Sequence, residues 1–205
     1  FTNEDITYLK SIGYEEDFLN YLKDLKFTGN IKSMQEGEIC FGNEPLLRVE
    51  APLIQAQLIE TILLNIINFQ TLIATKASRI RQIATHDTLM EFGTRRAQEI
   101  DAALWGARAA FIGGFDSTSN VRAGKLFNIP VSGTHAHALV QTYGDEYIAF
   151  KKYAERHKNC VFLVDTFHTL KSGVPTAIKV AKELGDTINF IGIRLDSGDI
   201  AYLSK

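Results

Sequence analysis

Five short groups of polar, charged and glycine residues in the second part of the chain have side chains suited to an anionic ligand. They span residues 92–96, 113–120, 133–137, 165–168 and 194–199. Arg95 and Arg194 each carry a planar guanidinium that suits a phosphate or a carboxylate. Ser197, Gly198 and residues 117–119 each precede an expected helix, where hydroxyl and backbone N–H groups could bind an anion or simply cap the helix. The sequence leaves both interpretations open.

Two histidines in one of these groups, His135 and His137, are separated by a single residue. Alternate side chains of an extended segment point to opposite faces, so only one of the two would enter a site. If the strand ended before them, both could bind a metal together with His168, Asp165 and Asp196. That arrangement would suit a metal-dependent barrel hydrolase, which is the alternative to the function argued below.

The composition limits the classes of partner. The 205 residues include 22 Lys and Arg against 24 Asp and Glu, a formal net charge of −2, so neither a nucleic acid nor a membrane surface is expected to bind. Hydrophobic residues make up 45% of the chain, as in a folded globular protein. The only cysteines, Cys40 and Cys160, lie far apart without metal-type spacing, which indicates a reducing, cytoplasmic compartment. The two commonest glycine-rich nucleotide-binding motifs do not occur.

Short strands alternate with helices in the second part of the chain. This order predicts parallel strands with helical crossovers, hence an α/β barrel or an open doubly wound sheet. The polar groups follow the ends of the expected strands, and in an α/β barrel such loops lie on one face, so we expect the groups to share one site. The expected strands are 88–92, 129–132, 160–165 and 188–195, and the expected helices are 97–112, 120–127, 145–157 and 174–184.

The first part of the chain has a different pattern. Residues 1–52 combine two short helices, the first with a capping box from Thr2 to Asp5, with short strand candidates, which predicts part of a small N-terminal α+β domain. Residues 53–87 carry an apolar side chain every three or four positions and predict one long connecting helix. Polar residues interrupt its apolar stretch, so we expect a buried helix of a soluble protein. Its basic end, which includes Arg81, either reaches a polar cleft or is solvated.

Four sequence motifs resemble, in the same order, those of bacterial nicotinate phosphoribosyltransferases. They are EFGTRRAQ at 91–98, IGGFDSTSNVRAG at 112–124, PVSGTHAH at 130–137 and IRLDSGD at 193–199. The resemblance implies a type II phosphoribosyltransferase fold, in which residues 88–205 form the first half of an incomplete (β/α) barrel that follows part of the N-terminal domain. Members of that family are more than twice as long, so we expect a partial chain that is inactive alone. A folding or interface unit without ligand affinity is the non-enzymatic alternative.

The resemblance also implies an activity. The full-length enzyme would transfer a phosphoribosyl group from 5-phosphoribosyl 1-pyrophosphate to nicotinate, coupled to ATP hydrolysis and dependent on Mg²⁺. The products would be nicotinate mononucleotide and pyrophosphate, which admits free nicotinate to NAD salvage. By the same resemblance, the enzyme would be a homodimer whose active site is shared between the subunits.

Residue roles follow from the resemblance as well. His137 matches the histidine that ATP phosphorylates, Phe92 matches an aromatic ring that stacks on the pyridine, and Asp196 would stabilise the cationic ribose. No role is assigned to His135 or His168. The remaining residues matched to binding of nicotinate and phosphoribosyl pyrophosphate are Arg95, Asp116, Thr134, Arg194, Ser197 and Gly198.

Overall fold

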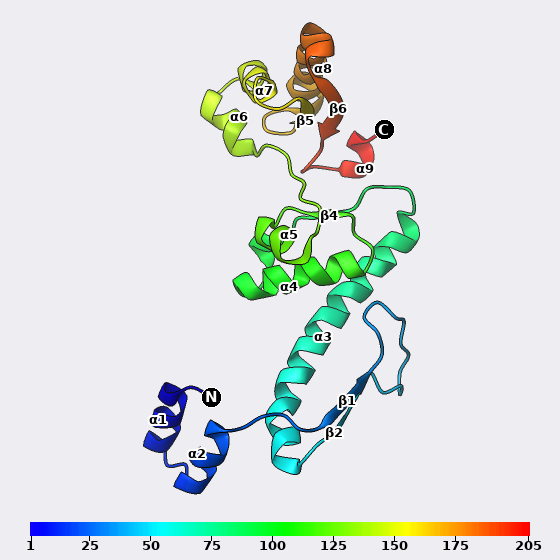
Figure 1. Ribbon diagram of the computed structural model, residues 1–205. Helices are drawn as coiled ribbons and strands as arrows, with labels where there is room; N and C mark the ends of the chain where they lie inside the picture. The colour runs from blue at the N-terminus through cyan, green and yellow to red at the C-terminus, as the bar shows by residue number, and fades with distance from the viewer. The chain divides into compact units, whose positions relative to one another are not determined.

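A computed structural model describes all residues from 1 to 205 (Figure 1). The chain divides into two compact units, Phe1–Val131 and Ser132–Lys205, and each has its own buried core. The predicted domain limits at residues 52 and 87 do not coincide with this division, and they stay predictions.

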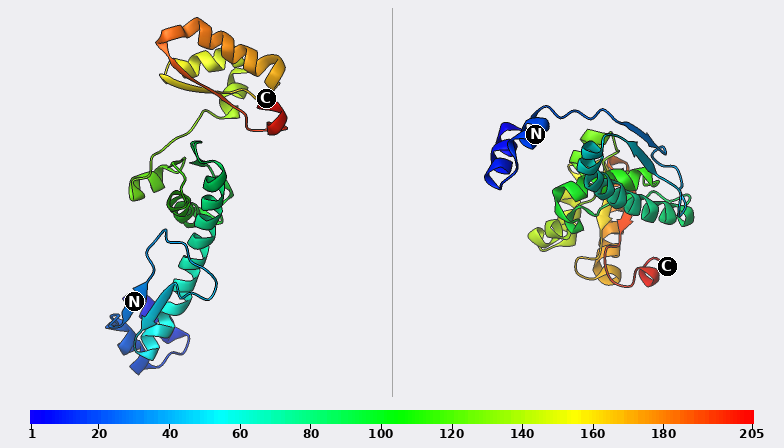
Figure 2. Two further views of the ribbon diagram at one scale, coloured as in Figure 1. Left: turned by 90° about the vertical axis from the view of Figure 1, so that its right-hand side faces the viewer. Right: turned by 90° about the horizontal axis from the view of Figure 1, so that it is seen from below.

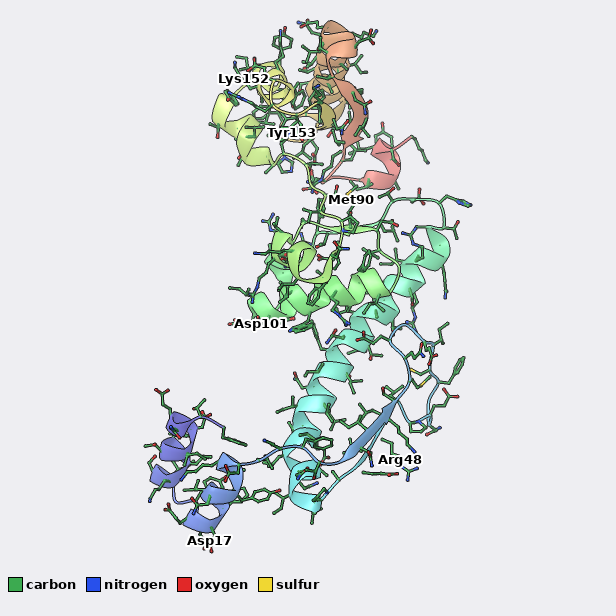
Figure 3. The ribbon with its side chains drawn as sticks, in the orientation of Figure 1. Asp17, Arg48, Met90, Asp101, Lys152 and Tyr153 are labelled. Carbon is green, nitrogen blue, oxygen red and sulfur yellow. The ribbon has the colours of Figure 1, made fainter.

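The first unit begins with two helices and a hairpin. The predicted capping box is confirmed, because the Asp5 N–H donates to Thr2 Oγ1 at 3.2 Å and the Thr2 N–H donates to Asp5 Oδ2 at 2.7 Å. The two helices bury Ile6, Leu19 and Leu22 against each other. The hairpin strands pair antiparallel, and Arg48 on the second strand (labelled in Figure 3) forms an ion pair with Glu50. The elements are α1 (Asn3–Ser11), α2 (Glu16–Lys23), β1 (Asn30–Ser33) and β2 (Leu47–Glu50).

The predicted long helix is confirmed as α3 (Leu53–Ile83), but the prediction that it is buried is wrong. Its length is 31 residues, about 46 Å at the usual rise per residue, whereas α4 (Glu99–Ile112), the helix that packs against it, has 14 residues. Ile62, Leu64 and Leu72 are therefore left about 60% exposed. By length and composition alone α3 could span a bilayer, since an 18-residue window has a mean hydropathy of 1.5, although soluble core helices also meet this criterion.

Close backbone approach joins α3 to α4. A Cβ on Gly113, the residue that ends α4, would lie 2.4 Å from the Ala74 carbonyl oxygen and 2.6 Å from the Ala77 Cβ. Only glycine leaves room for this crossing. The C-terminal end of α4, after which the polar loop at residues 113–120 begins, is therefore held against α3.

Parallel pairing begins with β3 (Met90–Glu91) and β4 (Ser117–Thr118), and Thr118 also bridges Val131 in parallel. The expected strand at 129–132 is thus reduced to this single bridge. Residues 117 and 118 were expected to precede a helix directly, but they form β4 instead. Asn120 caps the following helix α5 (Val121–Phe127) by accepting from the Ala123 N–H at 3.1 Å.

The second unit is a strand, helix and strand arrangement with three further α-helices. The strands β5 and β6 are parallel, and α8 connects them and runs along the pair (Figure 2). Their core contains Val140, Phe150, Phe162, Val164 and Val180. The sequence predicted these strands and α8 but missed α6. The elements are α6 (His137–Tyr143), α7 (Glu146–Ala154), β5 (Asn159–Leu163), the π-helical turn η2 (Thr169–Gly173), α8 (Val174–Leu184), η3 (Gly185–Thr187), β6 (Asn189–Arg194) and α9 (Ile200–Leu203).

The fold is mixed α/β, and the predicted partial barrel is not seen. The strands form three separate two-stranded sheets, of which β3–β4 and β5–β6 are parallel. A (β/α) barrel requires eight parallel strands that close on one another. Here the parallel pairing is present but stays local to each unit.

Candidate functional site

The ends of β5 and β6 bring together most of the predicted site residues of the second unit. Asp165 and Thr166 follow β5, Arg194 ends β6, and Asp196 and Ser197 follow it. Thr134 and His137 come from the segment that enters α6. We call these seven residues the strand-end cluster: Thr134, His137, Asp165, Thr166, Arg194, Asp196 and Ser197.

Arg194 connects two members of the strand-end cluster. Its Nη1 donates to Thr134 Oγ1 at 2.7 Å, and its Nη2 forms a charge-assisted hydrogen bond with the Asp196 carboxylate. Burial raises the pKa of Asp196, but the hydrogen bond and charge of Arg194, together with His137, outweigh burial and hold that pKa below its ordinary value. Asp196 is therefore an anion at neutral pH.

His137 lies between two polar partners. Its Nδ1 is 3.1 Å from Thr166 Oγ1, and its Nε2 is 3.4 Å from Asp196 Oδ2. The side chain remains 34% exposed, so the imidazole is both oriented and accessible. His137 is the first residue of α6 rather than part of an extended segment.

Asp165 is the most buried member of the strand-end cluster, with a side chain 2% exposed. Its Oδ2 accepts from the Asp196 N–H at 3.1 Å and from Ser197 Oγ at 2.5 Å. Its Oδ1 has no hydrogen-bond partner and lies 4.0 Å from His137 Nε2. Asp165 thus holds the turn after β6 while facing His137. The sequence indicated a role for Asp165 only as a metal ligand, and its position at the end of the expected strand 160–165 was the one available signal.

Gly198 gives the turn after β6 its backbone conformation. Its φ of +80° lies in the left-handed region that other residues rarely adopt. Asp199, not Ser197 or Gly198, caps α9 by accepting from the Tyr202 N–H at 3.0 Å. Of the two interpretations that the sequence left open, helix capping does not apply to Ser197 or Gly198, and the Ser197 hydroxyl donates to Asp165 instead.

Three predicted site residues, Phe92, Arg95 and Asp116, belong to the first unit. Asp116 Oδ2 accepts from the Leu89 N–H at 2.7 Å and from Arg81 Nη2 at 2.5 Å. These two donors, the backbone one first, lower the pKa of the Asp116 carboxyl. Phe92 is partly buried, and Arg95 is exposed in the 3₁₀ turn η1 (Thr94–Arg96).

Two residues without a predicted role position the loops of the first unit. Arg81, at the basic end of α3, donates from Nε to the Gly114 carbonyl at 2.7 Å, so its guanidinium contacts a polar loop and is not merely solvated. Glu91 accepts from Thr118 Oγ1 at 2.7 Å and from the Gly93 N–H. Glu91 thereby fixes the start of the loop that carries Phe92.

Two other histidines, His135 and His168, have distinct surroundings. His135 is buried and its Nε2 accepts from the Leu163 N–H at 3.0 Å, so it does not form the metal-binding pair with His137 that the hydrolase alternative required. His168 is exposed and its Nδ1 accepts from the Lys171 N–H at 3.2 Å, which caps η2.

Comparison with known proteins assigns this arrangement to a family. The sequence-family model of the nicotinate phosphoribosyltransferase N-terminal domain matches residues 1–68. The sequence-family model of the nicotinate phosphoribosyltransferase family matches residues 88–204. The chain belongs to the nicotinate phosphoribosyltransferase family. The second match includes every member of the strand-end cluster.

Individual nicotinate phosphoribosyltransferases are similar over the whole chain. That of Bacillus subtilis (strain 168) is 71% identical over 206 residues, which cover 100% of this chain and 42% of the relative. One from Mycobacterium tuberculosis (strain H37Rv) is 40% identical and is covered to 44%. The chain therefore spans less than half the length of these curated relatives.

Solved structures support the fold. The crystal structure of human nicotinic acid phosphoribosyltransferase superposes with a TM-score of 0.87 at 30% identity, covering 98% of this chain and 51% of the human chain. The crystal structure of nicotinate-nucleotide pyrophosphorylase from Pyrococcus furiosus gives a TM-score of 0.75 at 33% identity. It covers 84% of this chain and 43% of the Pyrococcus chain. The mixed α/β arrangement is thus that of nicotinate phosphoribosyltransferase structures.

Proposed function

We propose that the whole protein transfers a phosphoribosyl group from 5-phosphoribosyl 1-pyrophosphate to nicotinate, coupled to ATP hydrolysis, and so forms nicotinate mononucleotide and pyrophosphate for NAD salvage. The observation that carries the proposal is the strand-end cluster, in which an accessible imidazole, an ionised carboxylate and a guanidinium lie together in a chain of this family. No single residue type would support the assignment alone.

Arg194 is proposed to bind the nicotinate carboxylate. Its guanidinium lies beside Thr134 and Asp196, and the charge and planar shape of this group suit a carboxylate. A carboxylate gains a charge-assisted hydrogen bond there, whereas an uncharged amide gains less. Arg194, together with Thr134, would thus favour nicotinate over nicotinamide.

His137 is proposed to accept the γ-phosphoryl group of ATP on a ring nitrogen, with ADP as the leaving group, and to lose it later to water. Its contacts with Thr166 and Asp196 hold the ring in a fixed orientation. Phosphorylation adds about two negative charges. Because Asp196 is already an anion beside the ring, the added charge would repel it and release it from His137.

Asp196, once released, is proposed to face the ribose as pyrophosphate departs. The sugar then carries positive charge, which a nearby carboxylate stabilises. Mg²⁺, which binds through one or two carboxylates and substrate phosphates, would offset charge on the leaving pyrophosphate. The unpartnered Oδ1 of Asp165, beside Asp196, suits such an ion. Ser197 and Gly198 would supply polar contacts to the substrate from the same turn.

Several finer points belong to this proposal. Phe92 would stack on the pyridine ring, and Arg95 and Asp116 would contact the phosphoribosyl and base groups. In the whole protein the parallel pairs β3–β4 and β5–β6 would be strands of one (β/α) barrel. We further propose a cytoplasmic homodimer with a shared active site.

Labelling with γ-³²P-ATP tests the proposal in the full-length protein. We expect acid-labile, base-stable label in the wild type and none in His137→Asn, which should uncouple ATP hydrolysis from product formation but retain some phosphoribosyl transfer. His168→Asn is the matched control, since asparagine can also cap η2, and it should keep the label. A labelled His137→Asn protein would contradict the assignment of His137.

A further inference from the structure

His135, to which the proposed function assigns nothing, makes a specific buried contact. It is 7% exposed and contacts the rings of Phe150 and Tyr153, whose centroids are 5.8 and 4.8 Å from its own. Its Nε2 accepts from the Leu163 N–H at 3.0 Å. A backbone N–H can only donate, so Nε2 carries no proton and the neutral ring is protonated on Nδ1.

The Leu163 N–H points away from the β5–β6 pair. Successive N–H groups along a strand alternate in direction, and the next one, that of Val164, donates to the Arg194 carbonyl at 3.2 Å. Leu163 is 1% exposed, so water cannot replace a missing acceptor. The His135 ring therefore supplies the acceptor for a backbone donor that β6 does not reach.

This hydrogen bond joins the segment that carries His137 to the segment that carries one of its contacts, Thr166. His135 precedes His137 by two residues, and Leu163 precedes Asp165 by two and Thr166 by three. We infer that His135 is a positioning residue, whose acceptor at Leu163 fixes the segment before α6 against the end of β5 and thereby places the His137 imidazole beside Thr166 and Asp196. The activity part of this inference rests on the proposed function, whereas its structural part does not.

Two nearly isosteric variants separate positioning from simple packing. In His135→Gln the side-chain Oε1 can accept from the Leu163 N–H, whereas in His135→Met a chain of similar length fills the space without a strong acceptor. If His135 only fills space in the core beside Phe150 and Tyr153, the two variants should behave alike.

The test uses the full-length protein and two readouts, hydrogen exchange of the Leu163 amide and the rate of phosphate labelling of His137 from ATP. In His135→Met we expect exchange at least about tenfold faster and labelling at least about tenfold slower than in wild type, because a buried donor loses its acceptor. His135→Gln should restore both to within a few fold. Equal behaviour of the two variants at Leu163 would overturn the inference.

The outcomes also distinguish this inference from the proposed function. If the wild type shows no phosphohistidine, the proposed function fails, yet Leu163 exchange still decides the role of His135. If His135→Met does not fold, the ¹⁵N chemical shifts of the His135 ring in the wild type remain decisive. A protonated Nε2 would contradict the contact on which the inference depends.

Discussion

At the scale of single residues, the strand-end cluster derives its properties from pairing rather than from residue type. Asp196 is anionic because Arg194 and His137 outweigh the cost of its burial, and Asp165 is tolerated in a buried position because it accepts two hydrogen bonds. Removing one partner should therefore affect the others.

Arg194→Lys tests this coupling. Lysine keeps the charge but loses the planar fork that contacts Thr134 and Asp196 together. We expect kcat/KM for nicotinate to fall by a factor that corresponds to about 1.5–3 kcal/mol of lost transition-state stabilisation, the value of a hydrogen bond to a charged group. The KM for nicotinate should rise more than the KM for phosphoribosyl pyrophosphate. Steady-state kinetics of the full-length enzyme measure both.

The matched control is Arg156→Lys, an exposed arginine of the same unit that makes no ion pair. It should leave both kinetic constants unchanged. If Arg194→Lys behaved like this control, Arg194 would have to be removed from the proposed nicotinate site.

At the scale of elements, the sequence indicated where β5 and β6 end, because the apolar, β-forming run of each strand is followed by a polar group. It could not indicate how the connections fold. Helix α6 has seven residues and, unlike α5, no side chain caps its start. Strand β4 has two residues, and its pairing depends on Glu91 and on Val131. The buried role of His135 likewise depends on a partner 28 positions away.

Gly173→Ala tests how tightly η2 and α8 pack against β5. A Cβ on Gly173 would lie 1.8 Å from the Val164 carbonyl oxygen and 2.7 Å from its carbon. Backbone atoms cannot move aside as a side chain can, so we expect the free energy of unfolding to fall by about 3 kcal/mol, the upper part of the range for overpacking. Denaturant unfolding measures this change.

Gly133→Ala provides the comparison within the same unit, because nothing lies within 4 Å of its added Cβ. Its free energy of unfolding should change by less than about 0.5 kcal/mol. Equal stability of the two variants would mean that η2 does not approach β5 as closely as described.

At the scale of the whole molecule, the family and the local α/β units were predictable because four motifs and the strand order lie in the sequence itself. The degree of burial of α3 could not be predicted, since helical periodicity indicates an apolar face but not what covers that face. A groove of about 590 Å³ lies between β2 and α3, and its lining includes Leu64 and Leu72. Contiguous apolar surface of this kind mediates association when it is uncovered.

The exposed face of α3 gives a prediction for the 205 residues expressed as a separate chain. We expect this chain to bind the dye ANS and to self-associate, because Leu64 and Leu72 are 63% and 62% exposed beside an apolar groove. Leu64→Glu combined with Leu72→Glu should lower dye fluorescence and favour the monomer in sedimentation velocity, since glutamate keeps helix propensity and adds charge. Lys76→Glu, an exposed polar position on the same helix, controls for charge alone and should change neither. If the double variant bound as much dye as the wild type, the apolar surface responsible would have to lie elsewhere than on α3.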